Sequence, residues 1–195
     1  MIEIGSGIGQ FTELLTKNPK IKTLRGVEPD ERFCREFVKR LPGVPLIQGT
    51  IKAVSDDLDA IVSINVLEHI EDDKGELALY SKLLRNKQGR LCLFVPARPE
   101  IYSLIDKDFG HFRRYTRKEL KTKLGKAGFE IEMIRYYNLT GYFAWWFSFK
   151  VLKQRSFNIH SVRFYDRFIF PISHFLENIC PPPFGQNLIV VAKAK

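Results

Sequence analysis

Short apolar runs alternate with segments of helical periodicity along most of the chain, a pattern typical of an α/β fold. The apolar runs predict strands at residues 2–4, 23–27, 44–47, 60–64, 91–95, 130–135 and 188–192. The periodic segments predict helices at about residues 10–16, 30–41, 74–84 and 116–127. Asp30 is a residue type that caps helix N-termini, and Thr116 and Glu119 are predicted to form a capping box. The fourth run, 60–64, is almost wholly apolar, which indicates a strand buried on both faces.

Aromatic residues are concentrated in one stretch near the C-terminus. Residues 136–170 contain 13 of the 25 aromatic residues in the chain. We interpret residues 136–185 as a helical insertion that forms a lid between the last two strands of a single domain spanning residues 1–195. The rings either pack as core beneath this lid, or line an apolar acceptor pocket, or form a surface where Trp145, Trp146 and Lys150 meet lipid.

Composition narrows the class of protein. The chain has 195 residues, 45% of them hydrophobic, and a net charge of +9, which favours acidic partners such as nucleic acid, anionic lipid or a phosphorylated substrate. A basic surface kept for solubility explains the charge equally well. Three dispersed cysteines argue against a zinc ribbon or a disulfide scaffold. With neither a signal peptide nor a membrane-spanning segment in the sequence, we expect a cytoplasmic protein, with peripheral membrane contact as an alternative.

A glycine-rich turn follows the first predicted strand. In the segment from Glu3 to Gly9 the glycines have the spacing GxGxG, and Gln10 occupies the place of the third glycine of a dinucleotide fingerprint, which argues against nicotinamide or flavin binding. Glu28 comes 23 residues after Gly5, at the end of the second predicted strand. A carboxylate in that place accepts hydrogen bonds from the hydroxyls of a ribose, although a solvated strand-end acid is the simpler alternative.

Polar residues also follow the fourth strand, in the segment Asn65-Val66-Leu67-Glu68-His69-Ile70. Together with the glycine turn, Glu28, Gly49-Thr50 and Gly128-Phe129, this segment gives the chain a resemblance that spans nearly all of its length. The sequence resembles class I S-adenosylmethionine-dependent methyltransferases of the small-molecule type, similar to methyltransferase types 11 and 12.

The resemblance implies a Rossmann-like, doubly wound sheet of seven strands whose last strand is antiparallel, with S-adenosylmethionine as cofactor. It also implies that family members carry residues before the first strand that cover the cofactor. Since Met1 begins within that strand here, we expect this N-terminal cover to be missing. The cofactor-binding residues implied are Glu3, Gly5, Ser6, Gly7, Glu28, Pro29, Thr50, Ile51, Asn65 and Val66.

Two histidines are candidates for a catalytic base, because a histidine pKa suits proton transfer at neutral pH. His69 follows the fourth strand, and His111 lies in a loop rich in His, Arg and Tyr after the fifth. Each could instead order its loop. Some relatives bind a divalent metal through a Glu-x-x-Glu-His segment, but Asn65 replaces the first glutamate here, so we predict no metal site.

The same loop offers residues for an acidic acceptor. Arg113, Arg114 and Tyr115 are predicted to bind substrate, the arginines through bidentate contacts; the alternative is a solvated surface loop. The leading hypothesis is methyl transfer to an oxygen or nitrogen of a small or lipid- or glycan-linked acceptor. An RNA methyltransferase using the basic surface is less favoured, because the sequence motifs of the base-modifying families are absent. A non-catalytic protein that kept the fold is the third hypothesis.

Overall fold

A computed structural model describes all residues from 1 to 195 and contains a single seven-stranded sheet. The strand order is β3-β2-β1-β4-β5-β7-β6, and β7 runs antiparallel to both of its neighbours. The seven strands and the antiparallel last strand confirm what the resemblance implied. The strands are β1 (Ile2–Ile4), β2 (Arg25–Glu28), β3 (Leu46–Gln48), β4 (Ala60–Ile64), β5 (Arg90–Pro96), β6 (Phe129–Tyr137) and β7 (Asn187–Ala194).

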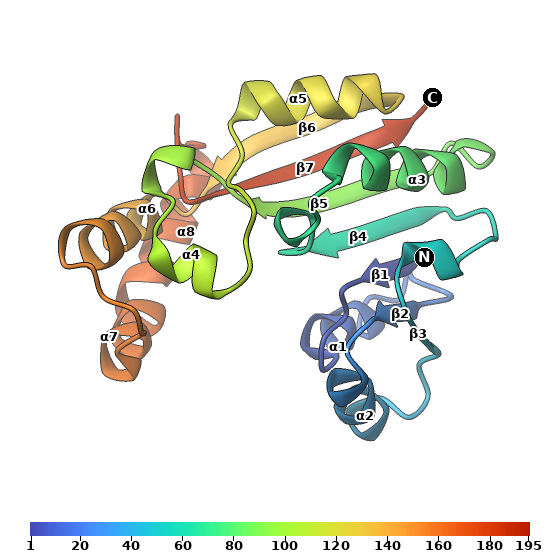
Figure 1. Ribbon diagram of the computed structural model, residues 1–195, viewed down its shortest axis with the longest axis horizontal. Coiled ribbons are helices and arrows are strands. Elements are labelled where there is room, and N and C mark those ends of the chain that lie inside the picture. Colours follow the sequence, from blue (N-terminus) through green and yellow to red (C-terminus); the bar gives the residue numbers. More distant parts are fainter.

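Helices connect the strands and cover the sheet (Figure 1). Two of them, α3 and α5, lie on the same face of the sheet, where their leucines pack into the main core. That core also contains Ile2, Ile61 and Val190, which are fully buried. The helices outside the segment between β6 and β7 are α1 (Gln10–Thr16), α2 (Glu31–Arg40), α3 (Asp73–Arg85), α4 (Leu104–Asp108) and α5 (Arg117–Lys126).

The predicted caps differ in outcome. The Asp30 side chain caps α2 by accepting the N–H of Arg32, as expected. The Thr116 side chain likewise accepts the N–H of Glu119 at the start of α5. The reciprocal half of the predicted capping box does not form, because the Glu119 carboxylate pairs with Lys123 at 2.7 Å.

The segment between β6 and β7, residues 138–186, is here called the insertion. It contains α6 (Leu139–Trp145), α7 (Ile159–Phe164) and α8 (Phe170–Ile179), with π-helical turns after α6 and after α7. It lies beyond the carboxyl ends of β4 and β5 (Figure 1). No helix of the chain has both the length and the apolar character needed to cross a bilayer.

The aromatic residues of this region do not form a core, which corrects one of the sequence interpretations. Of the 13 rings between residues 136 and 170, only Tyr136 and Phe149 are buried. The outer side of the insertion has few packing partners, because none of the residues of α7 is buried. Six rings are exposed to solvent: Phe143, Trp146, Phe147, Phe157, Phe164 and Phe168.

Candidate active site

The glycine turn after β1 is held in left-handed backbone geometry. Gly5, Gly7 and Gly9 have φ angles of 67°, 53° and 81°, which residues with a side chain adopt at a cost. A side chain at Gly5 would collide with Val66, whereas one at Gly7 would meet nothing within 4 Å. Packing therefore requires glycine at position 5, and the backbone at Gly7 borders open space where a ligand can approach.

Glu28 points toward this turn. One of its carboxylate oxygens accepts the N–H of Gly7 at 2.8 Å, and the other accepts the N–H of Asp30 at 2.9 Å. A carboxylate has about four acceptor positions, so each oxygen keeps one that these bonds do not use. The geometry therefore brings Glu28 and the glycine turn together at the carboxyl ends of β1 and β2.

Glu3, which begins the glycine motif, is buried and bonded inside the fold. Thr12 of α1 donates a hydrogen bond to its carboxylate at 2.5 Å. Burial raises the pKa of Glu3 to about 7, and the Thr12 bond opposes that rise. Glu3 thus ties α1 to β1. Ser6 is buried as well, with its hydroxyl 3.5 Å from the carbonyl oxygen of Val27.

The ends of the neighbouring strands complete the edge. The N–H of Gly49 donates to the carbonyl of Glu28 at 2.9 Å, so the end of β3 lies beside the end of β2. Pro29 and Thr50 are exposed there, whereas Ile51 is buried in the main core. Asn65, just after β4, is exposed and has a φ of 52°. Its backbone N–H donates to the carbonyl oxygen of Phe94 in β5 at 2.8 Å.

The two candidate histidines lie against each other although they are distant in the sequence. The ring centroids of His69 and His111 are 4.6 Å apart, in an edge-to-face arrangement. The Nδ1 atom of His111 lies 3.0 Å from a carboxylate oxygen of Asp106, and its Nε2 atom lies 4.0 Å from an oxygen of Glu68. Glu68, His69 and His111 offer ligand atoms within 4.8 Å of one another, so the same group of residues could hold a metal ion.

Burial controls the charges in this cluster. Both carboxylate oxygens of Glu68 are buried without a hydrogen-bond partner, and burial raises its pKa to about 8. Burial also lowers the pKa of His69, and the neighbouring His111 lowers it further. For Asp106, burial is outweighed by hydrogen bonds from His111 and Arg114, which hold its pKa below the ordinary value. At neutral pH, Asp106 is therefore anionic and Glu68 is mostly protonated.

The predicted substrate residues separate into two groups. Arg114 borders the same cavity as the two histidines; it is paired with Asp106 at 2.8 Å, and its guanidinium lies 4.4 Å from the centre of the Trp145 ring. Arg113 instead donates to the carbonyl oxygens of Ile70 and Glu71.

Tyr115 is fully buried, and its hydroxyl donates to the Asp73 carboxylate at 3.0 Å. Neither Arg113 nor Tyr115 lines the cavity, so the structure does not bring these two predicted residues to it. The physical reason is that their hydrogen-bonding groups are taken up in fastening the loop to the segment that follows β4.

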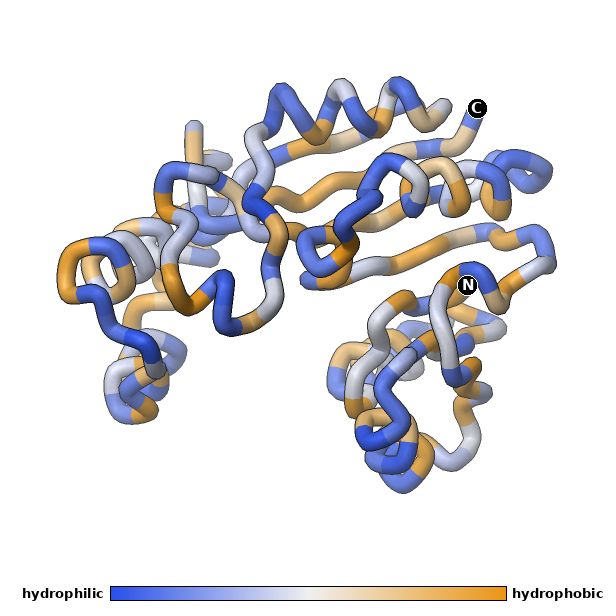
Figure 2. Tube along the Cα trace, viewed as in Figure 1, coloured by the Kyte–Doolittle hydropathy of each residue, from blue (hydrophilic) through white to orange (hydrophobic).

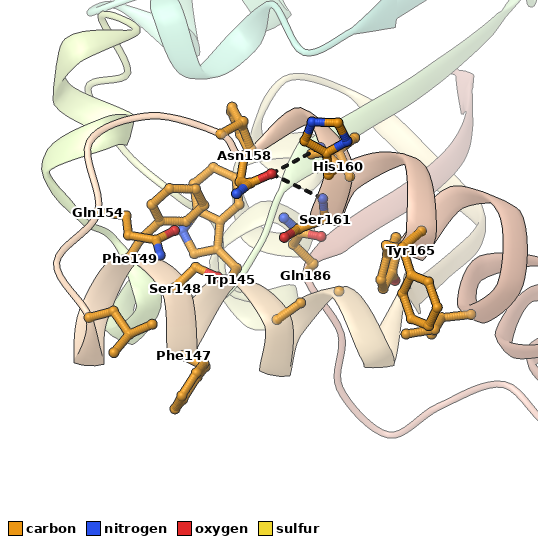
Figure 3. Close-up of a pocket in the computed structure, with 17 residues that line it drawn as sticks. Trp145, Phe147, Ser148, Phe149, Gln154, Asn158, His160, Ser161, Tyr165 and Gln186 are labelled. Carbon is orange, nitrogen blue, oxygen red and sulfur yellow. Dashed lines mark hydrogen bonds between the residues drawn. The ribbon is translucent and has the colours of Figure 1, made fainter.

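Two cavities meet at this edge of the sheet. The smaller, of about 430 Å³, is lined by residues that include Asn65, His69, His111 and Arg114. The larger, of about 790 Å³, lies within the insertion and has a mainly apolar lining (Figure 3). Trp145 and Gln186 line both cavities. The insertion therefore places an apolar cavity next to the cavity at the histidine cluster.

Sequence reasoning missed Asp106 and Gln186. Ser103 and Asp106 have the spacing of a capping box, and the structure contains that box at the start of α4. This signal could have predicted the helix and the buried carboxylate that holds His111. No local pattern marks Gln186, whose place at the junction of the two cavities depends on the docking of the insertion.

Comparisons with known proteins give one family. The model of a family described as "Methyltransferase domain" matches residues 1–134. An uncharacterized methyltransferase of Oceanobacillus iheyensis is 29% identical over 82 residues, which cover 40% of this chain and 38% of that protein. The match thus spans less than half of that relative's length.

Solved structures share the fold. A methyltransferase of Thermotoga maritima that depends on S-adenosylmethionine, described as a possible histamine N-methyltransferase, matches all of this chain and 81% of its own, with a TM-score of 0.64 and 19% identity. Magnesium protoporphyrin IX methyltransferase of Synechocystis, solved with bound SAH, matches all of this chain and 73% of its own, with a TM-score of 0.61 and 14% identity. At these identities the likeness is one of fold.

Proposed function

Because the chain belongs to the methyltransferase-domain family and has the fold of S-adenosylmethionine-dependent methyltransferases, we propose that it moves a methyl group from S-adenosylmethionine to an oxygen or nitrogen of a small or lipid- or glycan-linked acceptor. One observation carries the proposal. Glu28 meets the glycine turn at the carboxyl ends of β1 and β2, and β1 is the neighbour of β4, after which the histidine cluster lies. Open α/β sheets bind their ligands at this edge.

The residues at this edge suit an adenosyl group. The free acceptor positions of Glu28 are available to the two ribose hydroxyls, and the backbone at Gly7 leaves room beside them. Exposed Pro29 and Thr50 are proposed to flank the adenine. The methionine end is then directed along the turn toward Asn65. The proposed supporting residues, buried or half-buried, are Glu3, Gly5, Ser6, Ile51 and Val66.

S-adenosylmethionine supplies a methyl group that its sulfonium already activates, so the protein mainly has to align the acceptor, which can contribute roughly 7–11 kcal/mol. His111 is proposed to take the proton that the acceptor hydroxyl or amine loses, at Nε2. The anionic Asp106 at its Nδ1 holds the ring in place and stabilises the protonated imidazole. His69 packs edge-on against that ring and limits its rotation.

The two adjacent cavities support an acceptor with a polar and an apolar part. The reacting group would occupy the smaller cavity beside His111, and an attached apolar chain would extend past Trp145 into the larger one. Arg114 is neutralised by Asp106, so it contributes a donor rather than a free positive charge. This favours a lipid-linked acceptor over RNA.

Calorimetric titration with S-adenosylhomocysteine tests the cofactor site. Glu28→Gln and Glu28→Ala should weaken binding by about 10- to 100-fold, because a charged hydrogen bond contributes about 1.5–3 kcal/mol. The control is Glu31→Ala, at an exposed position on α2 that pairs only with Arg35. An unchanged dissociation constant in both Glu28 variants, with the fold intact, would refute the ribose role.

Labelled methyl transfer into lipid and glycan extracts tests the catalytic assignment. His111→Ala should lower kcat by about 100-fold or more and leave S-adenosylhomocysteine affinity within twofold; His174→Ala, at an exposed position outside the lining of both cavities, is the control. A chelator should leave the rate unchanged. If chelation abolishes transfer and Mg²⁺ or Mn²⁺ restores it, then Glu68, His69 and His111 form a metal site and the base assignment is wrong.

A further inference from the structure

The helix α8 has an inverted distribution of side chains. Its two buried residues are Ser173 and Glu177, both polar. Its most exposed apolar residues, 56–69% exposed, are Ile172, Phe175, Leu176 and Ile179. A helix at the surface of a water-soluble protein normally shows the opposite arrangement, with its apolar stripe facing the core.

A hydrogen-bonded polar network fills the inside of the insertion. The Glu177 carboxylate accepts the N–H groups of Asn138 and Leu139 at 2.8 Å each, and Ser173 donates to it at 2.9 Å. Tyr165 bonds the side chain of Asn138 at 2.5 Å. The polar groups of this network therefore satisfy one another internally, and the most exposed apolar residues of α8 are turned outward.

The outward apolar groups form one stripe. The chain is helical without a break from Ile159 to Ile179, and Phe164 and Phe168 continue the line of α8 at a helical spacing of four residues. In Figure 2 the insertion lies to the left of the sheet, and hydrophobic residues alternate with hydrophilic ones along its helices. An exposed, contiguous apolar surface of this kind marks an interaction site.

Charge indicates what covers this stripe. The insertion contains five lysines and arginines against two acidic residues. Arg163 and Arg167 each precede an outward phenylalanine, and the guanidinium of Arg167 lies 5.9 Å from the centre of the Phe168 ring. A second copy of the chain joined through a two-fold axis would bring these same positive groups together, which disfavours self-association. A surface with negative headgroups above an apolar interior matches both the charge and the stripe.

We propose that the insertion is a membrane-docking element, in which the stripe along residues 164–179 lies in the plane of an anionic bilayer and the flanking arginines contact its headgroups. The helix carries charged residues along its length and therefore lies on the bilayer rather than crossing it. The apolar cavity between α6 and α7 belongs to the same segment and so would open close to the lipid.

Sedimentation with vesicles of phosphatidylcholine mixed with phosphatidylglycerol, compared with phosphatidylcholine alone, tests this proposal on the full chain. Wild type should sediment with the anionic vesicles and bind the neutral ones at least tenfold more weakly. Both tryptophans of the chain, Trp145 and Trp146, lie in the insertion, so a blue shift of tryptophan fluorescence on binding should report burial there. Arg163→Gln and Arg167→Gln should each weaken anionic binding by about fivefold.

The decisive pair of variants places charges on exposed apolar sites. Ile172→Glu with Phe175→Glu should abolish sedimentation, whereas Leu14→Glu with Val38→Glu, at exposed sites on α1 and α2, should bind like wild type. Circular dichroism melting checks that both fold. Absence of vesicle binding by wild type, or equal binding by both double variants, overturns the proposal. So does a wild-type dimer that binds no vesicles and becomes monomeric only in the insertion variant, because the stripe would then join two copies.

Discussion

The turn after β1 and the insertion differ in which kinds of side chain they bury. Around the turn, apolar side chains such as Ile2 and Val27 are buried beside hydrogen-bonded polar groups such as Glu3, and Glu28 bonds the turn at the ligand edge of the sheet. In the insertion, Glu177 and Ser173 are inside, and Phe175 and Ile179 are outside. Hydrophobic burial therefore stabilises the first region, whereas internal hydrogen bonds hold the second together.

The largest effect is expected at Gly5. Gly5→Ala adds a methyl group where Val66 already lies and strains a left-handed backbone, so it should lower the free energy of unfolding by about 2–4 kcal/mol. Thermal denaturation should show a melting temperature lower by about 10 °C. Gly43→Ala, at a site with open space, is the matched control. Equal melting temperatures for the two variants would show that the turn is not tightly packed.

The next largest loss of stability is expected in the insertion, at Glu177. Glu177→Ala leaves the N–H groups of Asn138 and Leu139 without their acceptor, which should cost about 1–3 kcal/mol. Hydrogen exchange should accelerate in α6 and α8 and stay unchanged in β4 and β5. Asn178→Ala, on the exposed side of α8, should leave exchange as in wild type. Faster exchange throughout the sheet would contradict the separate stabilisation of the two regions.

A smaller, pH-dependent effect is expected at Glu3, whose pKa burial raises from 4.5 to about 7. A raised folded-state pKa contributes stability below pH 4.5 that is lost as the pH rises through 7. Glu3→Gln removes this loss, so the variant should gain about 1–2 kcal/mol over wild type between pH 4.5 and pH 6. Urea denaturation at both pH values measures the gain. A constant difference between variant and wild type would refute the titration.

The smallest effect is expected on the outward stripe. Ile172→Gln should change the free energy of unfolding in water by less than about 0.5 kcal/mol, because the side chain is already exposed. Ile61→Val, at a fully buried site of β4, should cost about 0.5–1.5 kcal/mol although it removes only one methylene. If the glutamine variant is clearly the less stable of the two, the stripe packs against the protein itself.

Local patterns predicted the elements that define the sheet. The strand at 60–64 matches β4, because a run that is apolar at nearly every position fits only a strand covered on both faces. The strand predicted at 23–27 is observed at Arg25–Glu28, since β1 pairs with residues 25–27 and β3 pairs with residues 26–28. Glu28 thus becomes the last residue of β2, where its carboxylate reaches the turn.

The loop after β5 was harder to interpret. Its arginines and tyrosine look alike in the sequence, yet Arg114 lines the cavity and Tyr115 is buried in the fold. Which one faces a ligand depends on partners more than forty residues away, such as Asp73 for Tyr115. The prediction that no metal binds rested on Asn65 alone, and no local pattern indicates that His111 lies beside Glu68 and His69.

The sequence by itself determined the seven strands, the helices α1, α2, α3 and α5, the glycine turn and the acid at the end of the second strand, because each depends on residues close together in the chain. Only the tertiary structure decided which histidines meet, which arginine is neutralised and which face of α8 meets the solvent. Hydrophobic periodicity tells how much of a helix is apolar but does not tell which side has a partner. In the insertion, a buried network of hydrogen bonds holds the polar side of α8 inward, so its apolar side faces the solvent.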